Sequence, residues 1–112
     1  MKEATLHNFE DEILSSNLPC IVKFTSEHCH LCVVLAPIFE RLEAKYAGKL
    51  NFFNVNTFAE EKLTEIFSGD GVPTVYIFAD GGASEIPYPE VPDEDSGYSE
   101  KYLKTYLDNF LN

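Results

Sequence analysis

The sequence predicts an α/β domain with a central mixed β-sheet and helices on both of its faces. Apolar runs rich in β-branched and aromatic residues alternate along the chain with stretches of helical periodicity. The 112 residues match the usual size of one domain, and the 45% of apolar residues, with nine Phe and six Tyr, suffice for a packed core. We therefore expect a single domain over residues 1–112, with the main elements in the order β-α-β-α-β-β-α.

The first part of the chain predicts a helix followed by a buried strand. Residues 5–14 begin with a short extended piece and continue as a helix that Asn8 can cap, with acidic residues in its first turn, where the helix dipole favours negative charge. Residues 20–26 are a β-rich apolar run, which indicates a strand inside the sheet. Its one anomaly is Lys23, because a lysine amine in a buried strand loses its hydration.

A longer helix and a second strand follow. Apolar residues recur at steps of three and four between residues 31 and 46, which is the pattern of one helix face. Pro37 lies inside this pattern and should kink the helix, and Gly48 can end it. Residues 51–56, with the sequence NFFNVN, are then expected to form the second strand.

The second half of the chain predicts a short helix, a strand and a final helix. Residues 59–68 form a short amphipathic helix, residues 72–80 a third strand, and the sequence DGG at 80–82 a tight turn out of that strand. Residues 98–111 form the last helix, which Ser99 can cap. The side chains of this helix expected to face the core are Leu103, Tyr106, Leu107, Phe110 and Leu111.

The stretch 84–97 contains three prolines and five acidic residues. Pro87 and Pro89 cannot donate the hydrogen bonds of a central strand, so we expect an edge strand or an extended loop here. Two interpretations of its charge remain open, because the stretch is either a solvated loop or an acidic surface that selects basic partners.

Cys29 and Cys32 carry the strongest functional signal, because they form a C-x-x-C motif at a predicted strand-to-helix junction. The free N–H groups and the positive dipole end of a helix N-terminus stabilise a thiolate. A thiolate is the attacking species in disulfide exchange, and side chains three residues apart on a helix are close enough to form a disulfide after a modest adjustment. One thiol can therefore attack a substrate disulfide, and the other can resolve the mixed intermediate.

Two other interpretations of the motif are open. Free cysteines are often buried, so the pair could fill the core. A structural zinc site needs four ligands around one point, and His28 and His30 stand too close to the cysteines along the chain to surround an ion with them. Because there is no second C-x-x-C and His7 is the only further histidine, we expect no metal site.

The chain resembles a thioredoxin over nearly its whole length. The strand IVKFTS leads into HCHLC at 28–32, Pro37 follows five residues after Cys32, GVPT at 71–74 precedes the third strand, and Gly97 matches the glycine before the last helix of that family. The resemblance implies the thioredoxin fold. It also implies a thiol–disulfide oxidoreductase that works without a bound cofactor.

The same resemblance implies roles for individual residues. Cys29 would be the exposed nucleophile and Cys32 the resolving thiol, and the two would form the redox disulfide. Pro73 matches the cis-proline of the family, and the backbone of Val72 would pair with an extended substrate segment. His28 and Gly97 would lie beside the same substrate groove.

The chain also departs from the family pattern in and around the motif. Where typical thioredoxins have WCGPC, His28 replaces the tryptophan, and His30 with Leu31 replaces the Gly-Pro pair. The buried acid of the family, thought to help deprotonate the resolving thiol, falls at Lys23. The family's lysine opposite that acid falls at Asn54.

Lys23 and His30 each allow two interpretations. Lys23 either extends its amine to water or tunes Cys32 as a cation or a neutral base, in which case Lys23→Asp should change the pH dependence of disulfide exchange. A protonated His30 beside Cys29 would stabilise the thiolate and make the protein less reducing than ordinary thioredoxins. The alternative is an exposed histidine without an energetic role.

Charge and cysteine content restrict the partners and the location. The net charge of −11 disfavours nucleic acid and anionic membrane surfaces as partners. The N-terminus lacks the pattern of a signal peptide, and no apolar run has the length of a membrane span. Three cysteines fit a cytoplasmic protein with one functional pair and a spare core thiol, Cys20, better than a secreted scaffold held by disulfides.

We therefore expect a monomeric, cytoplasmic oxidoreductase that exchanges disulfides with protein substrates and receives electrons from a separate reductase or a thiol pool. Two further functions stay open. The chain could be a non-catalytic binding module that holds a partner in the groove near Cys29 and Pro73, or a redox sensor. Trapping of mixed disulfides would separate a catalyst from a binding module, and turnover would separate it from a sensor.

Overall fold

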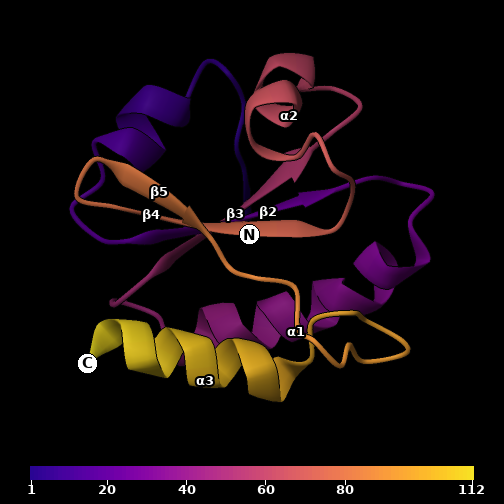
Figure 1. The fold of residues 1–112 in the computed structure, drawn as a ribbon. Coiled ribbons are helices and arrows are strands. Elements are labelled where there is room, and N and C mark those ends of the chain that lie inside the picture. The colour runs from indigo at the N-terminus through magenta and orange to yellow at the C-terminus, as the bar shows by residue number, and fades with distance from the viewer.

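A computed structural model describes all 112 residues and contains one five-stranded sheet between two layers of helices (Figure 1). The predicted α/β class with helices on both faces is confirmed. The strands are β1 (Lys2–Glu3), β2 (Cys20–Thr25), β3 (Asn51–Asn56), β4 (Thr74–Ala79) and β5 (Gly82–Glu85). The helices are the π-helix η1 (Glu10–Leu14) and the α-helices α1 (His30–Lys45), α2 (Glu61–Phe67) and α3 (Glu100–Leu111).

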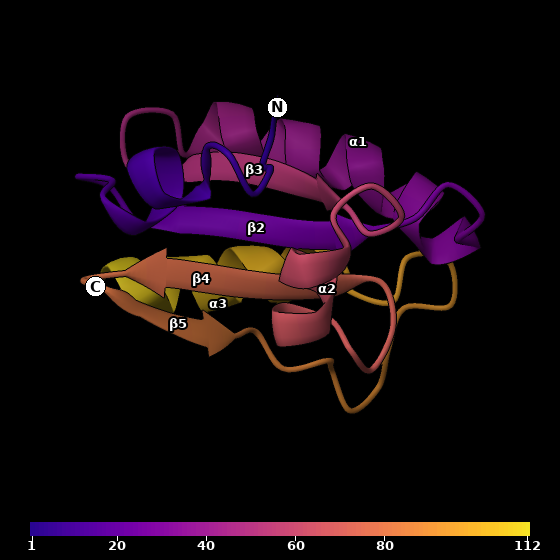
Figure 2. The same cartoon turned by 90° about the horizontal axis from the view of Figure 1, so that it is seen from above.

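The sheet is mixed, with the strand order β1-β3-β2-β4-β5. Figure 2 shows β3, β2, β4 and β5 side by side in this order. The strands β1, β3 and β2 run parallel, whereas β4 is antiparallel to β2 and β5 is antiparallel to β4. A two-residue turn joins β4 to β5, and both of its residues have positive φ, 53° at Asp80 and 79° at Gly81. This is the conformation that a tight hairpin needs, so the predicted turn at 80–82 is present.

Each face of the sheet buries its own apolar cluster. Helices α1 and α3 cover one face, and η1 and α2 cover the other (Figure 1). Side chains from α1 and α3, such as Leu35, Phe39 and Leu107, pack against Ile21 of β2. The other cluster joins Phe9, Ile13 and Leu63 to the opposite side of the same strand through Cys20, Val22 and Phe24. The strand β2 is therefore buried on both faces, as a central strand should be.

The first helix differs from the prediction, because Asn8 does not cap it. The Asn8 side chain accepts a hydrogen bond from the Thr5 N–H at 2.8 Å and donates one to the Glu3 carbonyl at 3.0 Å. Asparagine side chains readily bond to nearby backbone groups outside helices, and here that local bonding fixes the loop between β1 and η1. The helix begins at Glu10, after Phe9, with no side-chain cap. The sequence analysis also missed β1, which has only two residues.

The last helix is confirmed, but two of its five predicted core residues are wrong. Leu103 and Leu107 are buried and Ser99 caps the helix, because its hydroxyl accepts from the Tyr102 N–H at 3.0 Å. Phe110 and Leu111 are 41% and 37% exposed. Helical periodicity gives the inward face, but it does not tell where along its axis a helix stops contacting the sheet.

Two further features lie around the cysteine motif. Helix α1 begins at His30, two residues before Cys32, and continues through Pro37, which is exposed. After the short edge strand β5, the proline-rich stretch is a loop that closes on itself, because Asp93 and Gly97 exchange two backbone hydrogen bonds of 2.9 Å.

No helix combines the length and the apolar character needed to cross a lipid bilayer.

Candidate active site

The site lies where β2 passes into α1. Cys29 is the N-cap of α1, with an extended backbone (φ −101°, ψ 110°), and its sulfur accepts a hydrogen bond from the Cys32 N–H at 3.1 Å. A disulfide joins Cys29 and Cys32, whose Cα atoms are 5.2 Å apart. Because the first N–H groups of a helix have no partner within the helix, they can stabilise negative charge on the Cys29 sulfur once the disulfide opens.

The two cysteines differ in access. Cys32 is 4% exposed, whereas Cys29 is only half-buried. His28 and His30, which flank Cys29, are both exposed. A large partner can therefore approach the Cys29 sulfur while Cys32 stays covered, which is the asymmetry that a nucleophile and a resolving thiol require.

The loop before β4 lies beside this turn. The Val72–Pro73 peptide is cis, and Pro73 is buried. Val72 and Pro73 line a groove of about 260 Å³ together with Leu31, which stands between the two cysteines. Neither the N–H nor the C=O of Val72 bonds to another backbone group of the chain. Val72 thus offers a free donor and a free acceptor next to the disulfide.

A second cavity, of about 320 Å³, lies on the other side of the turn, and both Cys32 and Lys23 line it. Lys23 is 6% exposed, and its ammonium donates to the Asn54 side-chain oxygen at 2.7 Å. Asn54 is the register partner of Lys23 on β3, and it also donates to the Glu3 carboxylate at 3.2 Å. The sequence left open whether the Lys23 amine extends to water or tunes Cys32, and the structure bonds this amine into a Lys23–Asn54–Glu3 chain.

Burial lowers the pKa of the Lys23 amine, and the nearby carboxylates Glu3 and Glu40 partly oppose this shift. The amine also lies 5.6 Å from the centre of the Phe39 ring, at the distance of a cation–π contact. Both carboxylates line the cavity that Lys23 shares with Cys32. An ionisable network therefore reaches the cavity that Cys32 lines, which is separate from the groove at Val72 and Pro73.

Gly97 lies next to Tyr88, a residue that lines the groove with Val72 and Pro73. It is buried, has φ +74°, and lies under Tyr88, because a Cβ placed at Gly97 would come within 2.6 Å of the Tyr88 hydroxyl. The Tyr88 ring is 46% exposed and lines the groove with Val72 and Pro73. Tyr88 was not among the predicted site residues, because no motif in the proline-rich stretch 84–97 singles it out.

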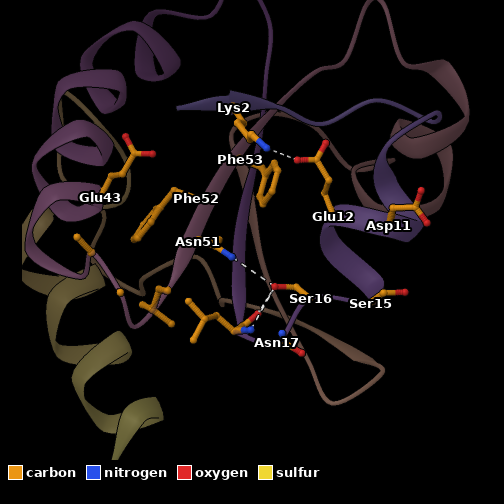
Figure 3. A pocket seen from close by; sticks show the side chains of 14 residues that line it. Lys2, Asp11, Glu12, Ser15, Ser16, Asn17, Glu43, Asn51, Phe52 and Phe53 are labelled. Atoms are coloured by element: carbon orange, nitrogen blue, oxygen red, sulfur yellow. Dashed lines mark hydrogen bonds and ion pairs between the residues drawn. The ribbon is translucent and has the colours of Figure 1, made fainter.

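A larger cavity, of about 830 Å³, lies at the opposite end of the sheet (Figure 3). It opens where β2 and β3 begin, and an Asn51 to Ser16 hydrogen bond of 3.3 Å and a Lys2–Glu12 ion pair cross it. No cysteine or histidine lines it. Its lining carries no thiol that could exchange disulfides, so chemistry rather than volume identifies the cysteine turn as the candidate site.

Cys20 takes no part in the site. It is fully buried at the start of β2, and burial raises the pKa of its thiol. Its sulfur contacts the carbonyl oxygens of Glu12 at 3.7 Å and Leu18 at 3.6 Å. Across the whole chain, no group of three or more His, Cys, Asp or Glu side chains is arranged to hold a metal ion.

Comparisons with known proteins agree with this geometry. A model of the family described as Thioredoxin matches residues 1–96. The chain is 30% identical over 112 residues to thioredoxin X, chloroplastic, of Arabidopsis thaliana, and it spans 59% of that protein. It is 29% identical over 110 residues to a thioredoxin of Buchnera aphidicola, spanning 95% of it, and 33% identical over 86 residues to protein disulfide-isomerase 2-3 of Arabidopsis thaliana, spanning 20% of it. Because the first of these relatives is chloroplastic, the cytoplasmic location stays a prediction.

Proposed function

Because this chain belongs to the thioredoxin family, we propose that it exchanges disulfides with protein substrates through Cys29 and Cys32. The observation that carries the proposal is the asymmetry of the pair. Cys29 is the accessible N-cap of α1 and accepts an N–H at 3.1 Å, while the disulfide partner Cys32 is buried behind it. A helix N-terminus beside a reachable sulfur is the environment that lowers a thiol pKa and favours attack.

In the reductive direction, the reaction has two steps. The Cys29 thiolate attacks one sulfur of a substrate disulfide, a Cys29–substrate disulfide forms, and the other substrate sulfur leaves as a thiolate. Cys32 then loses its proton to water and attacks the Cys29 sulfur, so the Cys29–Cys32 disulfide forms and the second substrate sulfur leaves. Two electrons pass from the dithiol to the substrate, and the two protons released from the dithiol balance those that the substrate thiols take up.

The oxidised pair must be reduced before another cycle. We infer that a separate reductase or a thiol pool supplies the two electrons, and that no bound cofactor takes part. His28 and His30 replace the family's usual neighbours of the nucleophile, so the surface that a reductase meets here carries imidazoles. An ordinary thioredoxin reductase should therefore recognise this chain less well than it recognises a typical thioredoxin.

The substrate segment is expected to lie along Val72 in an extended conformation. The free N–H and C=O of Val72 can complete a short β-bridge with it, a mode that binds backbone rather than a particular sequence. His28 would contact the substrate on the other side of Cys29. This arrangement would hold a substrate sulfur near Cys29 while the groove beside Pro73 receives the neighbouring side chain.

Trapping with Cys32→Ser tests the proposal. In a Cys20→Ser background, the Cys32→Ser variant should accumulate mixed disulfides with a disulfide-containing protein such as insulin, because Cys29 can attack but nothing resolves the product. The matched control, Cys29→Ser in the same background, should accumulate far fewer, since its remaining thiol is buried. Equal trapping by the two variants, or no trapping by either, would contradict the assigned roles.

Turnover separates a catalyst from a redox sensor and from a binding module. With dithiothreitol as the electron donor, the wild-type chain should reduce insulin through many cycles, and Cys29→Ser should not exceed the dithiothreitol background. A stoichiometric burst without further cycles would favour a sensor. Binding of the substrate without any disulfide exchange would favour a module.

A further inference from the structure

The first residues of the proline-rich loop are held firmly against α3, although they have no regular secondary structure. The Tyr98 hydroxyl donates to the Ile86 carbonyl at 3.0 Å, and the Tyr102 hydroxyl donates to the Pro87 carbonyl at 2.7 Å. The Tyr88 ring then packs edge-on against the Tyr98 ring, with centroids 5.3 Å apart at 81°. These three contacts give Tyr88 a defined position.

That position places the Tyr88 ring in the groove beside the disulfide. Its hydroxyl and ring lie over Gly97, where any side chain would collide with them. The glycine is therefore needed to admit the tyrosine, and the loop residues before it bring the ring there. Tyr88 forms one wall of the groove, and Val72, Pro73 and Leu31 form the side nearest the cysteines.

The charged side chains that line this groove are both acidic. They are Asp70, from the loop before Val72, and Glu85, from the end of β5. Both are exposed, and neither belongs to any of the four ion pairs of the chain. Burial raises the pKa of Tyr76 most, followed by the charge of Glu85, a side-chain hydrogen bond with Glu85 and the charge of Asp70, in agreement with the placement of both carboxylates in this groove.

We propose that Tyr88, Asp70 and Glu85 form a subsite for a lysine or arginine side chain next to the reacting cysteine of a substrate. The inference rests on the proposed disulfide exchange and adds the substrate class, a basic peptide segment. An aromatic face attracts a cation, and two carboxylates of the same groove that belong to no ion pair add Coulomb attraction. The net charge of −11 also favours the approach of basic partners.

The inference is tested with two peptides that each contain one intramolecular disulfide and differ only in having arginine or glutamine beside one cysteine. For the wild type, we expect kcat/KM about five- to tenfold higher for the arginine peptide. This is the preference expected when one partly exposed cation–π contact and one exposed ion pair stabilise the arginine side chain. In an Asp70→Asn/Glu85→Gln variant, this ratio should fall to at most about two- to fivefold, the preference that the Tyr88 ring alone can supply. An unchanged ratio in that variant would overturn the inference.

A charge-matched control distinguishes the subsite from the overall charge. Glu10→Gln/Asp11→Asn removes two exposed carboxylates of η1, which lies away from the cysteine turn. This variant should keep the preference for the arginine peptide, and an equal loss in both double variants would refute the subsite. Tyr88→Phe should keep most of the preference because it retains the ring, whereas Tyr88→Leu should lower it.

A binding measurement keeps the inference separate from the proposed chemistry. In a Cys29→Ser/Cys32→Ser background no exchange is possible, and the fluorescence anisotropy of labelled peptides reports the groove alone. Tighter binding of the arginine peptide, lost on Asp70→Asn/Glu85→Gln, would support the subsite even if turnover failed. Turnover with equal binding of both peptides would overturn the subsite and leave the proposed function standing.

Discussion

At the scale of single residues, Lys23 is the most unusual feature of the chain. It lies on a strand buried on both faces, and its amine has Asn54 as a hydrogen-bond partner instead of bulk water. Thr25 donates to the same Asn54 oxygen at 2.8 Å, so that acceptor remains bonded even if the lysine is removed. The local cost of Lys23 is therefore mainly the desolvation of its charge.

The lowered pKa of Lys23 predicts how stability depends on pH. Between its folded pKa and its unfolded pKa of about 10.4, the unfolded chain binds more protons, so the free energy of unfolding rises with pH through that window. The rise is at most about 1.4 kcal/mol for each unit by which the pKa is lowered. Urea unfolding of wild type and Lys23→Met at several alkaline pH values should show this rise only in the wild type.

Subtracting the wild-type free energy of unfolding from that of Lys23→Met at each pH removes the contributions of other groups. The tyrosines and the remaining lysines titrate in both proteins. The difference in stability between Lys23→Met and wild type should therefore be largest near neutral pH and should shrink as the pH approaches 10. A difference that stays constant with pH would mean that Lys23 has the same pKa in the folded and unfolded chains.

His30 is expected to affect the redox balance of the cysteine pair. It is the first residue of α1 and is directly bonded to Cys29. A protonated imidazole there favours the Cys29 thiolate and so stabilises the dithiol, which raises the reduction potential. His30→Gln should therefore shift the potential to a more negative value by about 10 to 30 mV, where 30 mV corresponds to about 1.4 kcal/mol.

Equilibration of the wild type and the variant with glutathione buffers at about pH 7 measures this potential. His28→Gln is the matched control, because His28 is also exposed but precedes the cysteine instead of opening the helix. A wild-type potential at or below about −270 mV, the thioredoxin value, would count against a stabilised dithiol.

At the scale of secondary-structure elements, the attachment of α3 decides how firmly the groove is held. Tyr46, the C-cap residue of α1, donates to the Asp108 carboxylate at 2.5 Å, and Arg41 of α1 donates to Glu100 at 2.7 Å. The hydrogen bond between the buried Tyr46 and Asp108 attaches α3 to the end of α1, and the buried face of α3 attaches it to the sheet. Because Tyr98 and Tyr102 hold the loop with Tyr88, a firmly attached α3 also keeps the groove in shape.

The two ends of the predicted inward face of α3 should differ sharply in their contribution to stability. Leu107→Ala removes a fully buried side chain and should lower the free energy of unfolding by about 2 to 5 kcal/mol. Phe110→Ala removes an exposed ring and should change it by less than about 0.5 kcal/mol. Urea unfolding of both variants measures the contrast, and equal losses would show that Phe110 packs in solution.

The elements themselves were largely predictable, because their signals are local. Repeats of apolar residues gave α1 and α3, and β-rich runs gave β2, β3 and β4. The C-x-x-C motif at a strand-to-helix junction gave the position of the disulfide. Asn8 was misjudged because its bonding to Thr5 and Glu3 depends on the path of the loop rather than on the neighbouring sequence.

The contacts between distant segments were not predictable in the same way. Tyr88 contacts Gly97 because the proline-rich loop, which has no regular secondary structure, folds back onto α3. The Lys23–Asn54 bond depends on the register of β2 against β3, 31 residues apart in the chain. No periodicity in the sequence encodes either contact. The family resemblance placed Asn54 opposite Lys23, but the hydrogen bond between them and the position of Tyr88 required the structure.

At the scale of the whole molecule, the excess of 19 acidic residues over eight lysines and arginines predicts self-repulsion in the folded state. Raising the salt concentration from about 0.01 to 0.15 M shortens the screening length from about 30 to 8 Å. We expect this change at pH 7 to raise the melting temperature by about 4 °C, less than 1 kcal/mol for a domain of this size.

The four ion pairs oppose this effect, since salt weakens them, but their side chains are mostly exposed and contribute little. Calorimetry at pH 7 and near pH 4.5, the sequence pI, provides the comparison. The salt effect should nearly vanish at the lower pH, where the net charge is close to zero. A melting temperature that falls with salt at pH 7 would mean that attraction between charges outweighs repulsion.

The inaccessibility of Cys20 has a consequence for handling the protein. In the folded protein the buried Cys20 thiol should not react, and Cys29 and Cys32 are joined in the disulfide. A thiol reagent added to the oxidised protein should therefore modify no cysteine. Unfolding by heat or denaturant exposes the Cys20 thiol to solvent and to Cys29 and Cys32. Three cysteines can then form three different disulfides. Scrambled, inactive isomers should then build up at alkaline pH, and replacing that one buried sulfur with serine should let the molecule recover after melting.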